Sequence, residues 1–179
     1  MTHGIRKATA EDLPEILEII RQGQSFLKSQ GLSQWQEDRG PKSVDIEQDI
    51  AKDEGYVFLY EERPCGYTSL VSGVDPVYTA ITEGQWETNI GQVYVSVHRV
   101  AVSMAIRGKG FGKIFLALIV AEAKKLGYAD IRIDTHLENL IMQKVITDTG
   151  FIYRGMVEFP FFDGRRKAYQ MIDRSVMGM

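Results

Sequence analysis

The stretch that decides the fold is RGKGFGK, residues 107–113, which places three glycines and three basic side chains in seven positions. It runs directly into the apolar segment IFLALIVAEAKKLG, residues 114–127, which has the character of a helix. Unpaired backbone N–H groups and the positive end of a helix dipole coincide at such a junction, so we expect an anion to bind there. The spacing of the glycines limits which anion it can be.

Two common phosphate-binding patterns do not match this turn. A Walker loop needs four residues between its first glycine and the Gly-Lys pair, then Ser or Thr for Mg²⁺. Here three residues separate Gly108 from Gly112, and Ile114 follows Lys113. A dinucleotide fingerprint needs a glycine at the position of Lys113. It also directly follows the first strand of the fold, whereas this turn comes after several predicted strands. The pattern therefore excludes a nucleotide triphosphatase and disfavours a dinucleotide-binding enzyme.

The composition indicates one folded, mildly acidic domain. The chain has 179 residues, 44% of them hydrophobic, with a net charge of −3 and a pI near 5.7. We therefore expect a single domain over residues 1–179 and no basic surface for nucleic acid. With no run of 18 apolar residues and no signal-peptide pattern, we expect a cytoplasmic protein with no membrane partner. The single Cys65 excludes an internal disulfide and a cysteine metal cluster.

Hydrophobic spacing predicts the elements of the N-terminal half. An Asp cap at Asp12, a proline in the first turn and an acid three positions on are typical of a helix start. The predicted elements are an edge strand at residues 5–8, this helix, a second helix with a mobile loop within residues 23–40, a short helix capped by Ser43, and a hairpin of residues 56–60 and 66–71. Residues 73–91 show no clear period, so this long connection is either functional or structured in a way the pattern does not reveal.

The C-terminal half contains two strand–helix units and a hairpin. The predicted elements are a strand from Gln92 to Val102, a helix from Gly110 to Leu126, a strand at residues 129–135, a helix from Glu138 to Asp148, and a hairpin of residues 151–159 and 166–172 around Asp163-Gly164. Taken with the N-terminal half, this order predicts a mixed α/β fold.

The glycine-rich turn resembles the acetyl-coenzyme A loop, R-x-x-G-x-G, of the GCN5-related N-acetyltransferase (GNAT) superfamily, here Arg107 to Gly112. The strand and loop HRVAVSMAIRGKGFG, residues 98–112, match the spacing of that family. Asn139 stands about a dozen residues before Gly150-Phe151, as it does in the family, and IRKATAEDLPEIL, residues 5–17, is similar to its first strand and helix. The resemblance covers residues 5–173. It implies a single-domain α/β (α+β) fold with a mixed central sheet of about six or seven strands, splayed in a V and flanked by about four helices.

The resemblance also identifies the expected anion as the diphosphate of coenzyme A. Acetyl-coenzyme A would then be the co-substrate, with its pantetheine arm paired to the exposed backbone of Val100, Ala101 and Val102. The diphosphate is expected at the turn, held by Arg107, Gly108, Lys109, Gly110, Phe111, Gly112 and Lys113. No metal is expected, because no His, Asp or Glu set has metal-ligand spacing.

Asn139 is predicted to bind the pantetheine arm from the opposite wall, again by resemblance. The alternative is an ordinary helix N-cap, because Asn139 precedes a predicted helix and asparagine favours that position. Both interpretations place its side chain at the start of the same helix.

The expected chemistry is direct attack of an amine on a thioester. A free alkylamine has a pKa of about 10.4, so exposing the neutral nucleophile at pH 7 costs about 4.6 kcal/mol and a base is useful. His98 is the predicted base, because strand alternation would place it on the same face as Val100 and Val102. Arylalkylamine acetyltransferases are similar here, with a catalytic histidine at the matching position. The alternative is a strand histidine that is hydrogen-bonded for structure.

One position departs from the family pattern. Many members carry a tyrosine seven residues after the asparagine, as the acid that protonates the departing thiolate, whereas this chain has Ile146. Tyr153 and Tyr169 are alternative acids, although a hairpin aromatic is the better interpretation of each. The general acid is therefore not identified by the sequence.

The remaining polar and aromatic residues are assigned structural roles. We expect His136 in a solvated turn, His3 in a frayed terminus and Cys65 in a turn. Lys124-Lys125 and residues 165–167 are expected on solvated faces. Three aromatic residues are either packing residues or walls of the acceptor pocket: Phe26, Trp35 and Trp86.

The leading hypothesis from the sequence is an acetyltransferase that acetylates a small-molecule or peptide amine. The first alternative is a degenerate acyl-coenzyme A-binding module without turnover, which Ile146 favours. The second is a protein-interaction domain that binds no cofactor. A homodimer is compatible with the family resemblance. Residues 23–40 and 73–91 are expected to shape the pocket that binds the acceptor.

Overall fold

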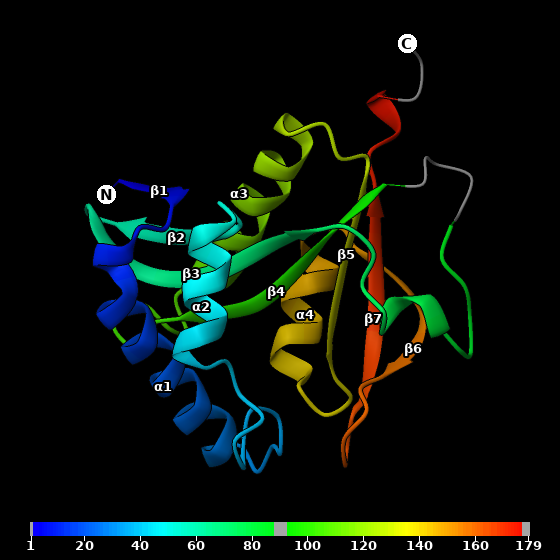
Figure 1. Cartoon of the computed structure of the whole chain (residues 1–179), viewed down its shortest axis with the longest axis horizontal. Helices are drawn as coiled ribbons and strands as arrows, with labels where there is room; N and C mark the ends of the chain where they lie inside the picture. Colours follow the sequence, from blue (N-terminus) through cyan, green and yellow to red (C-terminus); the bar gives the residue numbers. More distant parts are fainter. Residues whose placement is uncertain (1, 88–92, 177–179) are drawn as a thin grey trace.

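The sheet of this chain contains seven strands, in a computed structural model that describes residues 2–87 and 93–176 (Figure 1). The strands are β1 (His3–Lys7), β2 (Gly55–Tyr60), β3 (Arg63–Ser72), β4 (Tyr94–Val102), β5 (Asp130–His136), β6 (Ile152–Glu158) and β7 (Arg165–Ile172). Their order across the sheet is β1-β2-β3-β4-β5-β7-β6. The β4–β5 pair is parallel and the other described pairs are antiparallel, so the sheet is mixed as predicted.

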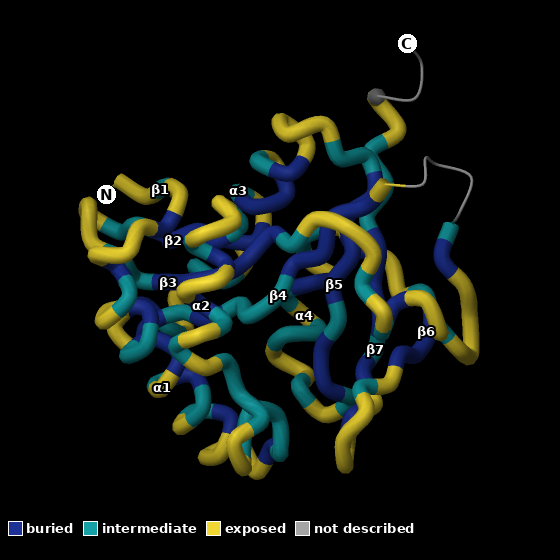
Figure 2. Tube along the Cα trace, viewed as in Figure 1, coloured by how far each residue is buried: buried dark blue, intermediate teal, exposed yellow. Residues whose placement is uncertain are grey.

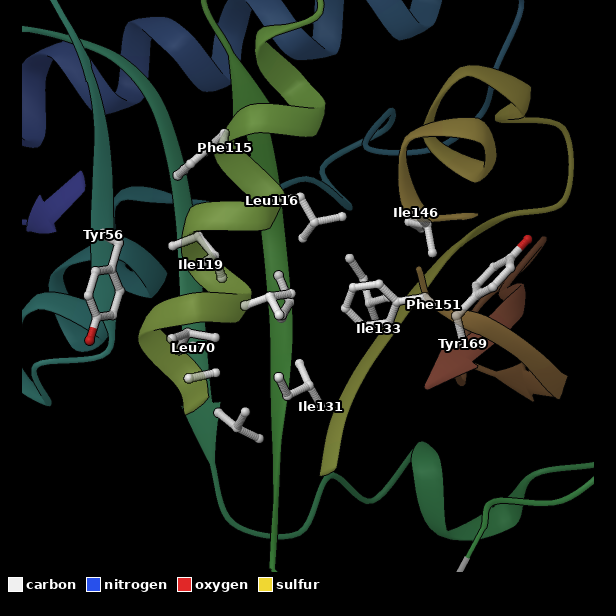
Figure 3. Packing of buried hydrophobic residues seen from close by; sticks show 14 of the residues in the cluster. Tyr56, Leu70, Phe115, Leu116, Ile119, Ile131, Ile133, Ile146, Phe151 and Tyr169 are labelled. Atoms are coloured by element: carbon white, nitrogen blue, oxygen red, sulfur yellow. The ribbon is translucent and has the colours of Figure 1, made fainter. Parts of the chain in front are cut away.

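In the described part of the chain, four α-helices cover the sheet, two on each face. They are α1 (Leu13–Ser29), α2 (Ser43–Ala51), α3 (Phe111–Lys125) and α4 (Leu140–Asp148), with short 3-10 turns at Ala10–Asp12, Tyr78–Ala80 and Arg174–Val176. One face packs Ile16 and Ile20 of α1 and Ile46 of α2 against Val57 and Tyr67. The other face packs α3 and α4, as Figure 3 shows with Phe115, Leu116, Ile119 and Ile146 over Ile131 and Ile133. The central strands are therefore buried on both sides (Figure 2).

Most predicted elements are confirmed within three residues at each end. The hairpins β2–β3 and β6–β7, the strand β5 and the helices α3 and α4 follow the hydrophobic periods and the glycine stops. The predicted start of β4 at Gln92 and the end of the long connection at Gly91 lie outside the described residues.

The second helix predicted within residues 23–40 is wrong, because α1 continues through Gly23 to Ser29. A Cβ on Gly23 would lie 3.2 Å from the ring of Trp35, so this glycine lets the following loop pack against the helix rather than ending it. Residues 30–42 contain turns but no second helix.

The predicted cap at Ser43 is also wrong by one position. Lys42 is the N-cap of α2, and its backbone N–H donates to Oδ2 of Asp45 at 2.7 Å. Ser43 is the first helical residue, and its hydroxyl donates to Glu47 at 2.5 Å. The carboxylate of Asp45 accepts from the N–H of the N-cap residue, which is one half of a capping box, and the hydroxyl of Ser43 does not cap the helix.

The parallel strands β4 and β5 separate along their length. Tyr94–Val97 pairs with Asp130–Ile133, and the described pairing between these two strands ends there. Residues 98–102 and 134–136 continue on diverging paths, while β5 stays paired with β7 through His136. The predicted V-shaped splay is thus confirmed, and it leaves an edge of β4 backbone without a strand partner.

A bulge at Arg99 sets the direction of the β4 side chains. Arg99 has a φ of 59°, the left-handed region. Tyr67 pairs with Ala101 and Ser69 pairs with His98, so the register advances by two residues on β3 and three on β4. The extra residue shifts the alternation of side chains by one.

The alternation argument for His98 is therefore wrong. Directly paired residues project to the same face, so His98 shares a face with Ala101, toward α1 and α2. Val100 and Val102 instead pack against the core beneath α3. His98 and the two valines lie on opposite faces of the sheet because the sequence pattern does not reveal the bulge.

A third cluster forms around the connection between β3 and β4. Tyr78, Trp86 and Tyr94 pack on Val157 and Ala168, and the indole N–H of Trp86 donates to the carbonyl of Tyr78 at 2.7 Å. The described part of this connection therefore covers the β5–β7 side of the sheet. Of the two interpretations of Trp86, the structure supports packing.

Candidate active site

One cleft lies where β4 and β5 separate and α3 begins. Its volume is about 1320 Å³, more than the ~300–1,000 Å³ of most small-molecule pockets, so it has room for two reactants. Eleven of the twelve predicted site residues line it: His98, Val100, Ala101, Val102, Arg107, Gly108, Gly110, Phe111, Gly112, Lys113 and Asn139. The exception is Lys109, whose ammonium group lies 3.3 Å from the carbonyl oxygen of Ala105.

The turn before α3 has the geometry of an anion site. Gly108 and Gly110 have φ of 79° and 81°, and a Cβ on either would meet nothing within 4 Å, so their requirement is conformational. Gly110 is the N-cap and has no side chain to satisfy the first amides. The backbone N–H groups of residues 111–113 are thus available at the positive end of α3.

Arg107 does not extend toward these amides. Its guanidinium lies 4.2 Å from the ring centroid of Phe26, and its Nη2 atom donates to the carbonyl of Val102 at 3.0 Å. The side chain therefore joins α1 to the end of β4 at the rim of the cleft. Phe26 and Trp35 both line the cleft, which supports their interpretation as pocket walls.

Asn139 is the N-cap of α4, so the cap interpretation is confirmed. Its Oδ1 accepts from the N–H of Met142 at 3.1 Å, and its Nδ2 donates to Oε1 of Gln34 at 3.0 Å. The side chain lines the cleft while it performs this structural role. Its contact with a cofactor remains a prediction.

His98 forms a hydrogen-bonded pair with Asp75 that the sequence did not predict. Its Nε2 lies 3.0 Å from Oδ2 of Asp75, and the two side chains are 20% and 16% exposed. Two further hydrogen bonds fix Asp75. Its Oδ1 accepts from the N–H of Val77 at 2.9 Å, and its own N–H donates to the hydroxyl of Tyr94 at 2.6 Å. Burial alone would raise the pKa of Asp75, but the hydrogen bond from His98, and the charge that this ring carries when it is protonated, lower it below its ordinary value.

Asp134 adds a second carboxylate on the same face. Its Oδ1 accepts from the hydroxyl of Tyr78 at 2.7 Å, and the Tyr78 ring lies 5.9 Å from the ring of His98. Burial raises the pKa of Asp134, with the nearby His98 and the Tyr78 hydrogen bond opposing the shift. In sequence, this residue belongs to a polar alternation on a central strand (Asp130, Arg132, Asp134 and His136), which is the signal that could have identified it.

Arg166 is a buried cation in the cleft wall. It is 6% exposed, and its Nη1 donates to the carbonyls of Asp163 and Arg165 at 2.7 and 2.8 Å. Burial lowers its pKa, opposed by the charges of Asp134 and Asp163. The prediction that residues 165–167 form a solvated basic face is therefore wrong at Arg166. Side chains alternate between the two faces of β7, and that of Arg166 lies on the buried face.

His136 is also buried rather than solvated. It is 2% exposed, its Nδ1 accepts from the N–H of Glu138 at 3.2 Å, and its Nε2 lies 2.9 Å from Oδ2 of Asp163. The hydroxyl of Ser33 also donates to Asp163. The histidine thus ties the end of β5 to the β6–β7 turn, and the described residues already engage both of its ring nitrogens.

Three other predictions for single residues are corrected or clarified. His3 lies in β1 with its ring 6.3 Å from Phe58, not in a frayed terminus. Cys65 lies within β3 rather than in a turn, and burial raises the pKa of its thiol, which makes it a poor nucleophile. Tyr153 and Tyr169 pack on each other at 5.8 Å, and neither lines the cleft, which supports the hairpin interpretation.

Ile146, at the family's tyrosine position, is fully buried on the face of α4 that packs against the core. Among the described residues, no tyrosine or cysteine lines the cleft. Within residues 2–87 and 93–176, no group of three or more His, Cys, Asp or Glu side chains is arranged to hold a metal ion. The helices in the part of the chain that is described are too short or too polar to cross a membrane.

Known structures share this architecture. An acetyltransferase of the GNAT family from Streptococcus agalactiae is 31% identical, with a TM-score of 0.87 over 96% of this chain and 95% of that one. A GNAT acetyltransferase from Listeria monocytogenes is 21% identical, with a TM-score of 0.71 over 96% and 95%. An aminoglycoside acetyltransferase in complex with ribostamycin and coenzyme A is 18% identical, with a TM-score of 0.71 over 100% and 98%, and shares the fold.

The sequence itself carries the same assignment. No curated protein sequence matches this chain. The model of the acetyltransferase (GNAT) family, however, matches residues 21–151, which include the glycine-rich turn, the splayed strands and Asn139. By this match and by its 31% identity to the streptococcal structure, the chain belongs to the GNAT family of acetyltransferases.

Proposed function

We propose that this protein transfers an acetyl group from acetyl-coenzyme A to a primary amine by direct attack, with His98 as the general base. The observation that carries the proposal is the convergence on one cleft of three parts. These are the open amides at the start of α3, the unpaired edge of β4, and the His98–Asp75 pair. Family membership supports an acyl-transfer reaction, and the geometry supports the role that we propose for each part.

The described residues fit coenzyme A. The amides of residues 111–113 and the ammonium group of Lys113 offer donors and charge to a diphosphate. The edge of β4 from Val100 to Val102 offers backbone groups to the amides of a pantetheine arm. On the other side of the V, the Thr135 side chain lines the cleft, is 1% exposed, and has a hydroxyl with no protein partner. Such an orphaned group supports a bound polar ligand.

The hydrogen-bond pattern of His98 supports its proposed role as the base. An ionised carboxylate only accepts, so the contact with Asp75 puts the ring proton on Nε2 and leaves Nδ1 as the acceptor. As the amine nitrogen forms its bond to the thioester carbon, the amine proton passes to Nδ1 and the carbon–sulfur bond breaks. Coenzyme A leaves as a thiolate. An ordinary thiol has a pKa of about 8.5, so this thiolate needs no strong acid to depart.

A second candidate function is an acyl-coenzyme A-binding module without turnover. The observation that favours it is the buried Ile146, where many family members place an acidic tyrosine, together with a described cleft wall that contains no tyrosine. This candidate keeps the cofactor site and predicts binding with no chemistry.

Thiol release separates the two functions. Acetyl-coenzyme A is incubated with the protein over a panel of small amines and N-terminal peptides, and free thiol is measured against the rate without amine. The proposal expects amine-dependent release that is lost in His98→Ala. Binding of acetyl-coenzyme A without release for every amine would establish the module instead. At 100 times Kd, binding stabilises the fold by about 2.7 kcal/mol, so a missing thermal shift would count against both.

A further inference from the structure

We propose that the acceptor carries a carboxylate as well as its amine, and that Arg166 binds this carboxylate. The inference rests on the proposed acetyl transfer and names its substrate class, an amino acid or a similar zwitterion. It depends on one anomaly, a buried arginine with no carboxylate oxygen of the described residues within ion-pair distance.

The anomaly is visible when the arginines of the chain are compared. Eight of the eleven have a carboxylate oxygen within 4 Å: Arg6, Arg21, Arg39, Arg99, Arg132, Arg154, Arg165 and Arg174. Of the other three, Arg63 is exposed, whereas Arg107 and Arg166 line the cleft. Arg39 and Arg99 line the cleft as well, but each has an ion pair, so Arg107 and Arg166 are the two cleft arginines without one among the described residues. Arg107 stands at the coenzyme end, and Arg166 stands at the other.

Arg166 is the more buried of the two. Its Nη1 donates to two backbone carbonyls, and its guanidinium lies 5.6 and 5.7 Å from the ring centroids of Phe159 and Phe161. Carbonyl oxygens and ring faces attract a cation but carry no net charge to neutralise it. A charge removed from water in this way is costly unless a counter-ion arrives. A carboxylate of the acceptor would supply that counter-ion.

The nearest protein carboxylates are committed elsewhere. The side chain of Asp163 accepts from Ser33 and contacts His136, while only its backbone carbonyl faces Arg166. Asp134 accepts from the hydroxyl of Tyr78, and it makes no ion pair with Arg166 within 4 Å. Both acids lower the local potential, but neither forms the bidentate contact that an arginine fork favours.

The same face provides a place for the amine. Asp134 pairs with Ala168 across β5 and β7, and Arg166 is two residues further along β7. These diagonal neighbours project to one face and are separated by roughly 7 Å, a span that a small zwitterion can bridge. An ammonium near Asp134 would approach His98, while a carboxylate reaches Arg166. A polyamine without an acid group would leave Arg166 unpaired and add positive charge beside it.

Matched acceptors test the inference directly. The common L-amino acids and their C-terminal amides are compared as acceptors at saturating acetyl-coenzyme A, with thiol release as the readout. A paired carboxylate should favour the best acid over its amide by at least about 10-fold in kcat/KM, the value of one hydrogen bond to a charged group. Binding of the same acid and amide to the coenzyme A-loaded protein, measured by calorimetry, should show the same preference.

The variants separate recognition from structure. Arg166→Gln should reduce the acid-to-amide ratio toward 1 while the affinity for acetyl-coenzyme A stays unchanged, and Arg166→Lys should keep part of the ratio. Arg165→Gln is the matched control, because its neighbouring side chain is exposed and pairs with Glu83. That variant should leave the ratio as it is in the wild type. If Arg166 only clasps the β6–β7 turn, its loss will lower stability without changing the ratio.

The outcomes are distinguishable from a failure of the proposed function. Equal use or equal binding of acid and amide by the wild-type protein overturns the carboxylate inference, whether or not the variants fold. A preference that survives in folded Arg166→Gln overturns the assignment to Arg166. Preferential binding of the acid without thiol release would instead retain the inference and overturn the acetyl-transfer proposal.

Discussion

The Nε2 atom of His98 lies 3.0 Å from Oδ2 of Asp75, and this contact determines which nitrogen of the ring is free to take a proton. The two residues come from different segments, one from the bulged part of β4 and the other from the connection after β3. Asp75 is itself fixed by the N–H of Val77. Histidine and carboxylate are therefore positioned by the fold before any substrate binds.

Asp75→Asn should impair turnover while leaving the fold in place. The Asn amide can keep an oxygen for the N–H of Val77, but it then turns an NH₂ group toward His98. That group donates, so the ring proton moves to Nδ1 and the base is lost. We expect kcat to fall by about 10²-fold or more, at unchanged affinity for acetyl-coenzyme A. ¹⁵N chemical shifts of His98 report the tautomer, and an unchanged tautomer would remove Asp75 from this role.

His98→Ala should lower turnover most at neutral pH. Without a base, the reaction depends on the fraction of acceptor amine that is already neutral, and that fraction rises about tenfold per pH unit below a pKa of about 10.4. The deficit relative to the wild type should therefore shrink as pH rises from 7 to 9. Rate profiles over this range measure it. A deficit of equal size at every pH would assign His98 a structural role.

Gly110→Val should weaken the binding of acetyl-coenzyme A. Gly110 has a φ of 81° with open space around its Cβ position, so a β-branched residue strains the turn without a clash. Relaxation of that turn would misplace the N–H groups at the start of α3. We expect at least tenfold weaker binding by calorimetry, with the fold retained by circular dichroism.

Gly127→Val is the matched control for this change. Gly127 follows the other end of α3, has a φ of 91°, and likewise has nothing within 4 Å of a Cβ. It should lose similar stability, of about 1–2 kcal/mol, and no affinity. Equal affinity losses in both variants would show that the glycines act through stability and not through the anion site.

The sequence predicts most elements of this fold because they are encoded locally. The apolar period of α3 and its glycine stop lie within one continuous segment, as do the hairpins. The bulge at Arg99 has no such local signal, because a positive φ at an arginine is held by tertiary contacts. Its Nη1 donates to Asp49 and Ser69, which are 50 and 30 residues away in the chain. The face of His98 could not be predicted without that bulge.

The residues of the candidate site likewise include some that the sequence predicts and others that it does not. The glycine-rich turn is recognisable because its chemistry is backbone chemistry at fixed spacing. Asp75 lies in a connection without a period, so its partner could not be deduced. Arg166 follows an exposed arginine and resembles a solvated run, yet it shares strand parity with Ala168 and Gln170, both fully buried. The alternation of side chains along β7 therefore indicated that Arg166 is buried. The run of basic residues favoured the opposite interpretation, a solvated face.

Asp12→Ala should destabilise the fold at neutral pH and much less in acid. Oδ2 of Asp12 accepts from the N–H of Thr9 at 2.8 Å and lies 2.7 Å from Nη1 of Arg6. The hydrogen bond from Arg6, and that from Thr9, hold the pKa of Asp12 at about 2 against the effect of burial. Because Arg6 is partly exposed, we expect a loss of only about 1–2 kcal/mol at pH 7.

The direction of the pH effect follows from this lowered pKa. The unfolded chain titrates its aspartates near 3.9, so the contribution of Asp12 is complete above that pH and is lost as pH falls toward 2. Urea unfolding from pH 7 to pH 2.5 should show the wild-type and Asp12→Ala curves converging below pH 4. Glu11→Ala, at the exposed neighbouring acid, should not reproduce that convergence. If the difference in the free energy of unfolding between wild type and Asp12→Ala stays constant down to pH 2.5, the charge of Asp12 contributes nothing to stability.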